Sequence, residues 1–293
     1  MDEAVARENT AGGEAPCGGN PENTPKKYKV LSGSVLKYIA IAAMLLDHTA
    51  FFFMPSGSVV WQISILIGGM TMPIMCFFIA EGYARTRNFN RYLLRLALFA
   101  AVSYLPFALM YGIANGGGHT LTLFGRKLPV EWRALSIIYS LALGLLAVKA
   151  YDKINNVVLR DLAVIAVVLL SVLGDWPMAV PPACLLFYTS RKRKYGYAHA
   201  LICITLLTTL LYVPYTYWYF WYDFKRIFEV LSENWISTAG ALLVIPLLSL
   251  YNGRRGGFES KAGRAFNKWF FYIFYPLHIT VLIVIYALTV APV

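Results

Sequence analysis

The chain has 293 residues, of which 58% are hydrophobic and only 14% are charged, and its mean hydropathy is +0.57. This composition excludes an ordinary soluble globular domain and allows several membrane spans of about 20 residues each. The formal net charge of +11 suits either a nucleic-acid-binding protein or a membrane protein with basic cytoplasmic loops. The apolar stretches favour the second explanation, so we expect no nucleic-acid partner.

Residues 1–30 are predicted to form a disordered cytoplasmic tail, because the first 25 residues are polar and rich in Gly, Pro, Asn and Glu. Residues 31–293 are predicted to form one transmembrane domain. Its apolar stretches predict helices at 35–54, 61–82, 92–113, 133–151, 160–174, 178–190, 197–221, 235–251 and 268–290. The segments 160–174 and 178–190 are short, and they form either two spans or a re-entrant pair. The predicted fold class is all-α, a polytopic transmembrane helix bundle of about nine spans.

The distribution of Lys and Arg predicts how this bundle is oriented. If the N-terminus is cytoplasmic, 21 basic residues fall on the inner side and five on the outer side, which together are all 26 Lys and Arg residues. Cytoplasmic loops of membrane proteins carry such an excess of basic residues. We therefore expect a multi-pass protein of the cytoplasmic (inner) cell membrane, in contact with lipids, with its N-terminus inside and its C-terminus outside.

Two histidines lie inside apolar spans, His48 in the first and His278 in the last. Ionisable groups at membrane depth are rare and usually functional. At 1.5 Å per residue, His48 lies about 20 Å and His278 about 15 Å from the cytoplasmic side, so we expect them to be neighbours if the first and last helices pack together. A neutral imidazole can accept a proton near neutral pH, which suits a general base. The alternative for both is a structural histidine bound to a backbone carbonyl or a hydroxyl.

Asp47 and the pair Tyr275–Pro276 lie next to these histidines in the sequence. On a helix, Asp47 points about 100° away from His48, so we do not expect it to orient that imidazole. It is available instead to a neighbouring helix, or to a hydroxyl or amine of a substrate. Pro276 should kink the last helix and free a carbonyl near Ile273, which would help to shape a cavity.

Basic residues cluster at the cytoplasmic ends of the predicted spans. Glu81 ends the second span, and the basic residues near it and in the last inner loop are Arg85, Arg87, Arg91, Arg95, Arg254 and Arg255. Guanidinium groups match the geometry of phosphates, but the same residues also suit contacts with anionic lipid head groups. No nucleophile elbow, zinc signature or dinucleotide fingerprint is present, so no metal site is predicted. The residues alone indicate a membrane-embedded histidine and carboxylate site with basic clusters, and they name no reaction.

Several segments are distinctive, and they include LKYIAIAAMLLDHTAFFF, MPIMCFFIAEGYARTRNFNRYLLRLALFAAVSYLPF and KWFFYIFYPLHI. They resemble the TraX family, named for the conjugative-plasmid protein that N-acetylates F pilin, and the resemblance extends from about Leu36 to Ile279. The family is similar in turn to the acyltransferase-3 membrane enzymes, whose first span carries a basic residue, ten residues and then a histidine. Lys37 and His48 have this spacing. The arginine pair of those enzymes has a two-residue gap, whereas three residues separate Arg91 from Arg95.

The resemblance implies a membrane-embedded O- or N-acetyltransferase that uses cytoplasmic acetyl-CoA as its acyl donor, so that residues 31–293 form an acyltransferase-like domain. The implied donor site is a basic inner mouth, with candidates Lys37, Glu81, Arg85, Arg87, Arg91, Arg95, Arg254 and Arg255. Implied catalytic residues are His48, which deprotonates or holds the acceptor, His278 or Tyr275, which donates to the developing oxyanion, and Asp47.

The acceptor is left open by this resemblance. It is an amine or hydroxyl on a pilin or peptide N-terminus, a glycan or a lipid head group. Two rival interpretations of the chain are a membrane transporter with a binding site near the midplane and a non-enzymatic membrane scaffold.

Overall fold

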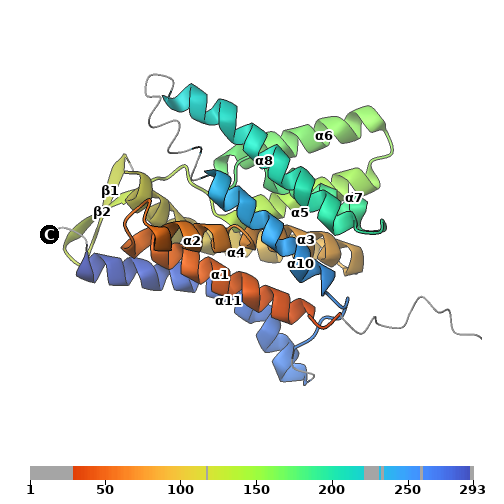
Figure 1. Cartoon of the computed structure of the whole chain (residues 1–293), viewed down its shortest axis with the longest axis horizontal. Helices are drawn as coiled ribbons and strands as arrows, with labels where there is room; N and C mark the ends of the chain where they lie inside the picture. The colour runs from red at the N-terminus through yellow and green to blue at the C-terminus, as the bar shows by residue number, and fades with distance from the viewer. Residues whose placement is uncertain (1–28, 117, 221–230, 232–233, 258–259, 291–293) are drawn as a thin grey trace, which may run out of the picture.

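The protein folds into a bundle of long helices with one small β-hairpin at one end (Figure 1). This computed structural model describes residues 29–290, except for 117, 221–230, 232–233 and 258–259. Nearly all of the predicted disordered tail, up to residue 28, lies outside the described residues.

The helices agree with the predicted segments. In chain order they are α1 (Gly33–Phe53), α2 (Val59–Gly68), α3 (Thr71–Arg85), α4 (Phe89–Asn115), α5 (Ile137–Lys153), α6 (Val157–Leu170), α7 (Val180–Ser190), α8 (Gly196–Phe220), α10 (Val244–Ser249) and α11 (Lys261–Thr289), with short 3-10 segments η2 (Ser171–Leu173) and η3 (Ala241–Leu243). Each of the nine predicted ranges contains a helix. The helix predicted from residue 133 begins at Ile137, and the one predicted from residue 268 begins at Lys261.

The β-hairpin was not predicted. Strand β1 (His119–Leu123) pairs antiparallel with β2 (Arg126–Val130) in the connection between α4 and α5. Its two-residue turn has positive φ at both Phe124 (51°) and Gly125 (77°), the backbone that tight hairpins need because it matches the twist of the strands.

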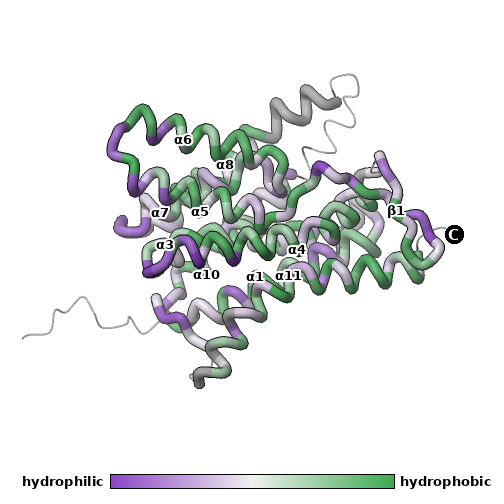
Figure 2. The backbone as a smooth tube through the Cα atoms, turned by 180° about the vertical axis from the view of Figure 1, so that it is seen from behind, coloured by the Kyte–Doolittle hydropathy of each residue, from purple (hydrophilic) through white to green (hydrophobic). Residues whose placement is uncertain are grey.

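Helical segments of the described chain are long and apolar enough to cross a membrane in four places: Gly33–Phe53, Val59–Arg85, Phe89–Ala114 and Trp269–Thr289. Shorter apolar helices include Gly196–Leu211 and Asn234–Ser249. Figure 2 shows hydrophobic residues along the helices and hydrophilic ones gathered at the connections. The protein is therefore a helical membrane protein, and the count of nine spans and the orientation stay predictions.

The helix predicted at 61–82 is broken in the middle, where α2 ends at Gly68 and α3 begins at Thr71. The break lies where two segments touch. A Cβ on Gly69 would lie 2.0 Å from the carbonyl oxygen of Ser237, and a Cβ on Gly240 would lie 2.0 Å from that of Leu66. Only glycine allows this approach, so these residues fix how α2 packs against the segment that leads into η3.

The turn between η2 and α7 packs against the beginning of α5. The amide of Leu135 donates to the carbonyl of Leu173 at 2.9 Å, and the amide of Asp175 donates to the carbonyl of Leu135 at 2.8 Å. The hydroxyl of Ser140 donates to the carbonyl of Asp175 at 2.9 Å. These bonds hold the Asp175 turn beside the first residues of α5.

Helices α1 and α11 lie side by side and form the frame of the candidate site (Figure 1). The hydroxyl of Tyr38 on α1 donates to Asn267 Oδ1 on α11 at 2.6 Å. The first amides of α1, those of Gly33 and Ser34, donate to the carbonyls of Arg254 and Arg255 at 2.9 and 2.8 Å. The loop after α10 therefore caps α1 and brings Arg255 to its N-terminal end.

Candidate functional site

His48 of α1 and His278 of α11 meet inside the bundle. Nδ1 of His48 lies 2.8 Å from Nε2 of His278, and the two ring planes are parallel to within 4° with their centroids 5.0 Å apart. His278 is only 6% exposed, and its ring also stacks on Phe274 at 4.8 Å. The predicted proximity of the two histidines is confirmed.

The hydrogen bonds of the pair determine its tautomers. Nδ1 of His278 lies 2.8 Å from the backbone carbonyl of Phe274, which can only accept, so this nitrogen carries a proton. In neutral His278 the other nitrogen, Nε2, is then an acceptor, and it must receive its hydrogen bond from Nδ1–H of His48. A neutral His48 consequently keeps its lone pair on Nε2. The pair presents one imidazole nitrogen able to accept a proton.

A cavity of ≈ 680 Å³ leads toward the pair, and its volume is within the size range of small-molecule sites. Helices α1 and α11 each contribute a stripe of residues to its lining. On α1, residues Lys37, Ile41 and Met44 line the cavity, and His48 continues the same stripe because eleven residues bring a helix back to nearly the same face. On α11 the lining residues Phe271, Tyr272 and Tyr275 lie on the stripe that leads to His278. The two stripes converge on the histidine pair.

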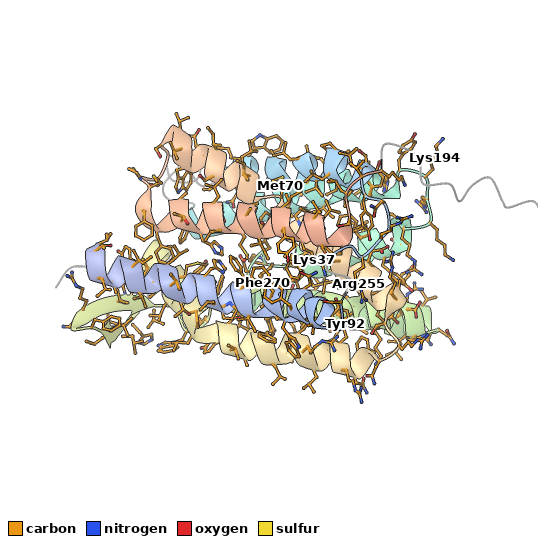
Figure 3. All side chains as sticks on the ribbon, turned by 90° about the horizontal axis from the view of Figure 1, so that it is seen from below. Lys37, Met70, Tyr92, Lys194, Arg255 and Phe270 are labelled. Atoms are coloured by element: carbon orange, nitrogen blue, oxygen red, sulfur yellow. The ribbon has the colours of Figure 1, made fainter. Side chains whose placement is uncertain are left out.

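The mouth of the cavity is strongly basic. Its lining includes Lys37, Arg85, Arg87, Arg95 and Arg255, against the single carboxylate of Glu81, which pairs with Arg85 at 2.6 Å. Figure 3 shows Lys37, Arg255 and Tyr92 close together at one end of α1 and α11. Two of the predicted donor-site residues, Arg91 and Arg254, are exposed and are not part of the lining.

Two of these cations have no acidic partner in the part of the chain that the structure describes. Lys37 Nζ lies over the rings of Phe78 and Phe271, 4.8 and 5.2 Å from their centroids. The guanidinium of Arg95 faces the ring of Tyr92 at 5.6 Å, and its Nε is buried without a hydrogen-bond partner. Half-buried cations without a carboxylate are costly, so their presence in a cavity wall indicates an anionic ligand.

The inner end of the cavity stops just short of the histidines. Neither His48 nor His278 is in the lining, but Met44 lies one turn before His48, about 6 Å along the axis, and Tyr275 lies three residues before His278. The rings of Tyr275 and His278 make an edge contact with centroids 5.7 Å apart. A molecule that filled the cavity would therefore reach Tyr275, whose ring is in contact with His278.

A family model described as "TraX protein" matches residues 32–286. The chain belongs to the TraX family. It is also 28% identical over 253 residues to the "Probable fimbrial assembly protein FimC, serogroup H1" of Dichelobacter nodosus, a match that covers 84% of this chain and 92% of that protein. No solved structure matches it.

In this TraX protein, Asp47 lies apart from the pair. It packs against α2, where a Cβ on Gly68 would lie 2.5 Å from the Asp47 Cβ. No described residue forms a hydrogen bond or an ion pair with its carboxylate. The sequence interpretation, that Asp47 does not orient His48 directly, agrees with this position.

Sequence reasoning missed Asp175, which lies in the turn 174–179, outside the four spanning helices. Burial raises the pKa of this carboxyl to about 6, although the amide of Trp176 donates to it at 3.0 Å. A related signal to the one used for His48 would have found it, because Asp175 is an ionisable residue between two short apolar segments. The aromatic walls of the cavity were also missed; they are Phe78, Tyr92, Tyr251, Phe271 and Tyr272.

The site offers no cluster suited to a metal. Within the described ranges, no group of three or more His, Cys, Asp or Glu side chains could hold an ion. What the arrangement provides is a cationic mouth, an aromatic and apolar channel, and a histidine pair beyond its inner end.

Proposed function

We propose that this TraX protein is a membrane-embedded acetyltransferase, which takes the acetyl group from acetyl-CoA in the cytoplasm and transfers it to an acceptor amine or hydroxyl. The observation that carries the proposal is the cavity, whose basic mouth and inner end lie on two helix stripes that converge on the histidine pair. This geometry suits a long molecule that is anionic at one end and reactive at the other.

The mouth fits the phosphates of the donor. Arg95 and Lys37 lack carboxylate partners among the described residues, and phosphate oxygens would supply charge-assisted hydrogen bonds to both. From Lys37 to His48 the α1 axis rises about 16 Å, which leaves room for an extended pantetheine arm between a phosphate and a reactive thioester. The aromatic rings along this channel would enclose the arm and exclude water.

The chemistry assigned to the pair follows from its tautomers. The acceptor nitrogen or oxygen attacks the thioester carbonyl carbon, a C–N or C–O bond forms and the C–S bond breaks. His48 Nε2 takes the proton of the attacking group, while His278, held by the Phe274 carbonyl, accepts the hydrogen bond from His48 Nδ1 and stabilises the imidazolium. The proton then passes to the departing sulfur, so the products are the acetylated acceptor and free CoA.

The comparisons and the charges support a choice of acceptor and of membrane orientation. The name of the Dichelobacter relative refers to fimbrial assembly, which makes the N-terminus of a fimbrial subunit the first acceptor to test, before glycans and lipid head groups. The basic mouth would face the cytoplasm, where the donor is found, with the protein in the inner membrane and its N-terminus inside.

A histidine substitution tests this proposal. His48→Ala in the detergent-purified chain should lower acetyl transfer from acetyl-CoA to a fimbrial-subunit peptide at least about 100-fold, because the general base is lost, and leave donor binding intact. Release of CoA and acetylation of the peptide are measured together. The control is His199→Ala, an exposed histidine on α8 that should keep full activity. Full turnover by His48→Ala would rule out this role for the histidine.

A further inference from the structure

The beginning of α5 is a buried helix N-terminus with unsatisfied donors. Its N-cap residue, Ser136, is 1% exposed, yet its side chain does not cap the helix and its Oγ has no hydrogen-bond partner. The amides of Ile137 and Ile138, at the first two positions of α5, have no carbonyl partner within the helix. Helix ends are normally satisfied by side chains, water or ligands, and the N-terminus carries partial positive charge.

A second group without a partner points to the same place. The hydroxyl of Tyr275 on α11 belongs to a side chain that is only 5% exposed, and it makes no hydrogen bond of normal geometry. Tyr275, Ile137 and Ile138 all line the inner end of the cavity. Buried polar groups are almost always paired, so an unpaired hydroxyl in the same cavity wall as the first turn of a helix indicates a ligand atom that accepts hydrogen bonds.

We propose that the first turn of α5 and the Tyr275 hydroxyl form an oxyanion hole for the thioester carbonyl of the acyl donor. This inference rests on the proposed acetyltransferase function and adds an element to it. The carbonyl oxygen accepts hydrogen bonds from the Tyr275 hydroxyl and the Ile137 amide. When the acceptor attacks, negative charge moves onto this oxygen, and it returns to re-form the C=O bond as the C–S bond breaks.

The location suits this step. Tyr275 contacts the ring of His278 and lines the cavity. The thioester carbonyl oxygen would therefore lie between the cavity and the histidine pair, and His48 would act as the base on the far side of that oxygen. Donors held in place before the reaction are worth more at a developing oxyanion than in water, because they need not reorganise. The dipole of α5, a helix of 17 residues, adds to the same effect.

Two substitutions remove one donor each without removing the scaffold. Tyr275→Phe deletes the hydroxyl. Ile137→Pro deletes one amide at the first position of a helix, where proline is well tolerated, and Ser136 already has the φ of −67° and ψ of 163° that a residue before proline prefers. The matched control is Ile137→Ala, which shortens the same side chain but keeps the amide.

The experiment compares binding of acetyl-CoA with that of S-ethyl-CoA, a thioether that lacks the carbonyl oxygen, to the full purified chain by calorimetry. The wild type should bind acetyl-CoA about tenfold more tightly than the thioether, because two hydrogen bonds are lost. This preference should shrink at least about threefold in Tyr275→Phe and in Ile137→Pro, and persist in Ile137→Ala.

The outcomes separate this inference from the proposed function. If both ligands bind the wild type equally, or if both donor-deleting variants keep the full preference, the oxyanion hole is wrong and the donor site stands. If neither ligand binds the folded protein, the proposed donor site fails and the inference fails with it.

Discussion

At the scale of single residues, the hydrogen bond between His48 and His278 sets the chemistry of the site. The Phe274 carbonyl accepts a hydrogen bond from Nδ1 of His278, which places the proton of that ring on Nδ1. Nε2 of His278 then accepts from Nδ1 of His48, which places the proton of His48 on Nδ1. An isolated histidine in an apolar helix would have either tautomer. The hydrogen bond between the two imidazoles therefore leaves one defined nitrogen, Nε2 of His48, as the basic atom.

The half-buried carboxyl of Asp175 should make the stability of the protein depend on pH. Its pKa is about 6 when folded and 3.8 when unfolded, so between these values the folded state binds more protons. The contribution of Asp175 to the free energy of unfolding is therefore largest below about pH 4, and it is lost as the pH rises through 6. Asp175→Asn removes the buried charge and keeps an oxygen for the Trp176 amide. It should stabilise the protein by up to about 3 kcal/mol at pH 8 and by only about 1 kcal/mol at pH 4.5.

Thermal unfolding in detergent at the two pH values measures this difference. Asp161→Asn is the control, because that carboxylate is 57% exposed and should give the same melting temperature at both values as the wild type. An Asp175→Asn protein with no stabilisation at pH 8 would contradict the assignment.

At the scale of helices, close contacts at glycine hold the broken α2–α3 segment in place. We expect Gly240→Ala to destabilise the fold by more than about 2 kcal/mol, because its Cβ would lie 2.0 Å from the backbone carbonyl of Leu66. Gly118→Ala is the matched control, since nothing lies within 4 Å of a Cβ there. The melting temperature of Gly240→Ala should be lower than that of Gly118→Ala. Equal melting temperatures would show that the contact between Gly240 and Leu66 does not determine the packing.

The helices themselves could be predicted from the sequence, because long apolar stretches identify spans whatever their neighbours are. Their breaks could not, since the end of α2 depends on Gly69 meeting Ser237 far along the chain. The hairpin left a local signal, the alternating residues 119–123 followed by Phe124–Gly125, which hydropathy alone does not detect.

The candidate site was partly predictable for the same reason. His48 and His278 stand out as ionisable groups in apolar segments, and similar depth was enough to expect their contact. The unsatisfied N-terminus of α5 has no such signal, because Ser136 and Ile137 look like an ordinary helix start. Packing also determines that Arg91 is exposed whereas Arg95 lines the cavity, and the sequence gives no sign of this difference.

At the scale of the whole molecule, two regions follow one another along α1 and α11. One end holds the cationic mouth, with Lys37 and Arg255, and the histidine pair lies deeper, past the inner end of the cavity. A soluble donor would enter from one side of the membrane and present its thioester at membrane depth. The acceptor would need to reach only the histidine pair, which fits acceptors that are themselves anchored in or near the membrane.

The most direct test of this account is calorimetric binding of acetyl-CoA to the purified protein, with Arg95→Ala compared with Arg91→Ala. The two arginines lie one turn apart on α4, but only Arg95 lines the cavity. Arg91→Ala is therefore the matched control for Arg95→Ala. We predict that the wild type and Arg91→Ala bind with similar affinity and that Arg95→Ala binds about tenfold more weakly, through loss of a charge-assisted hydrogen bond to phosphate. Absence of binding to the folded wild type, or equal weakening by both substitutions, would contradict the account.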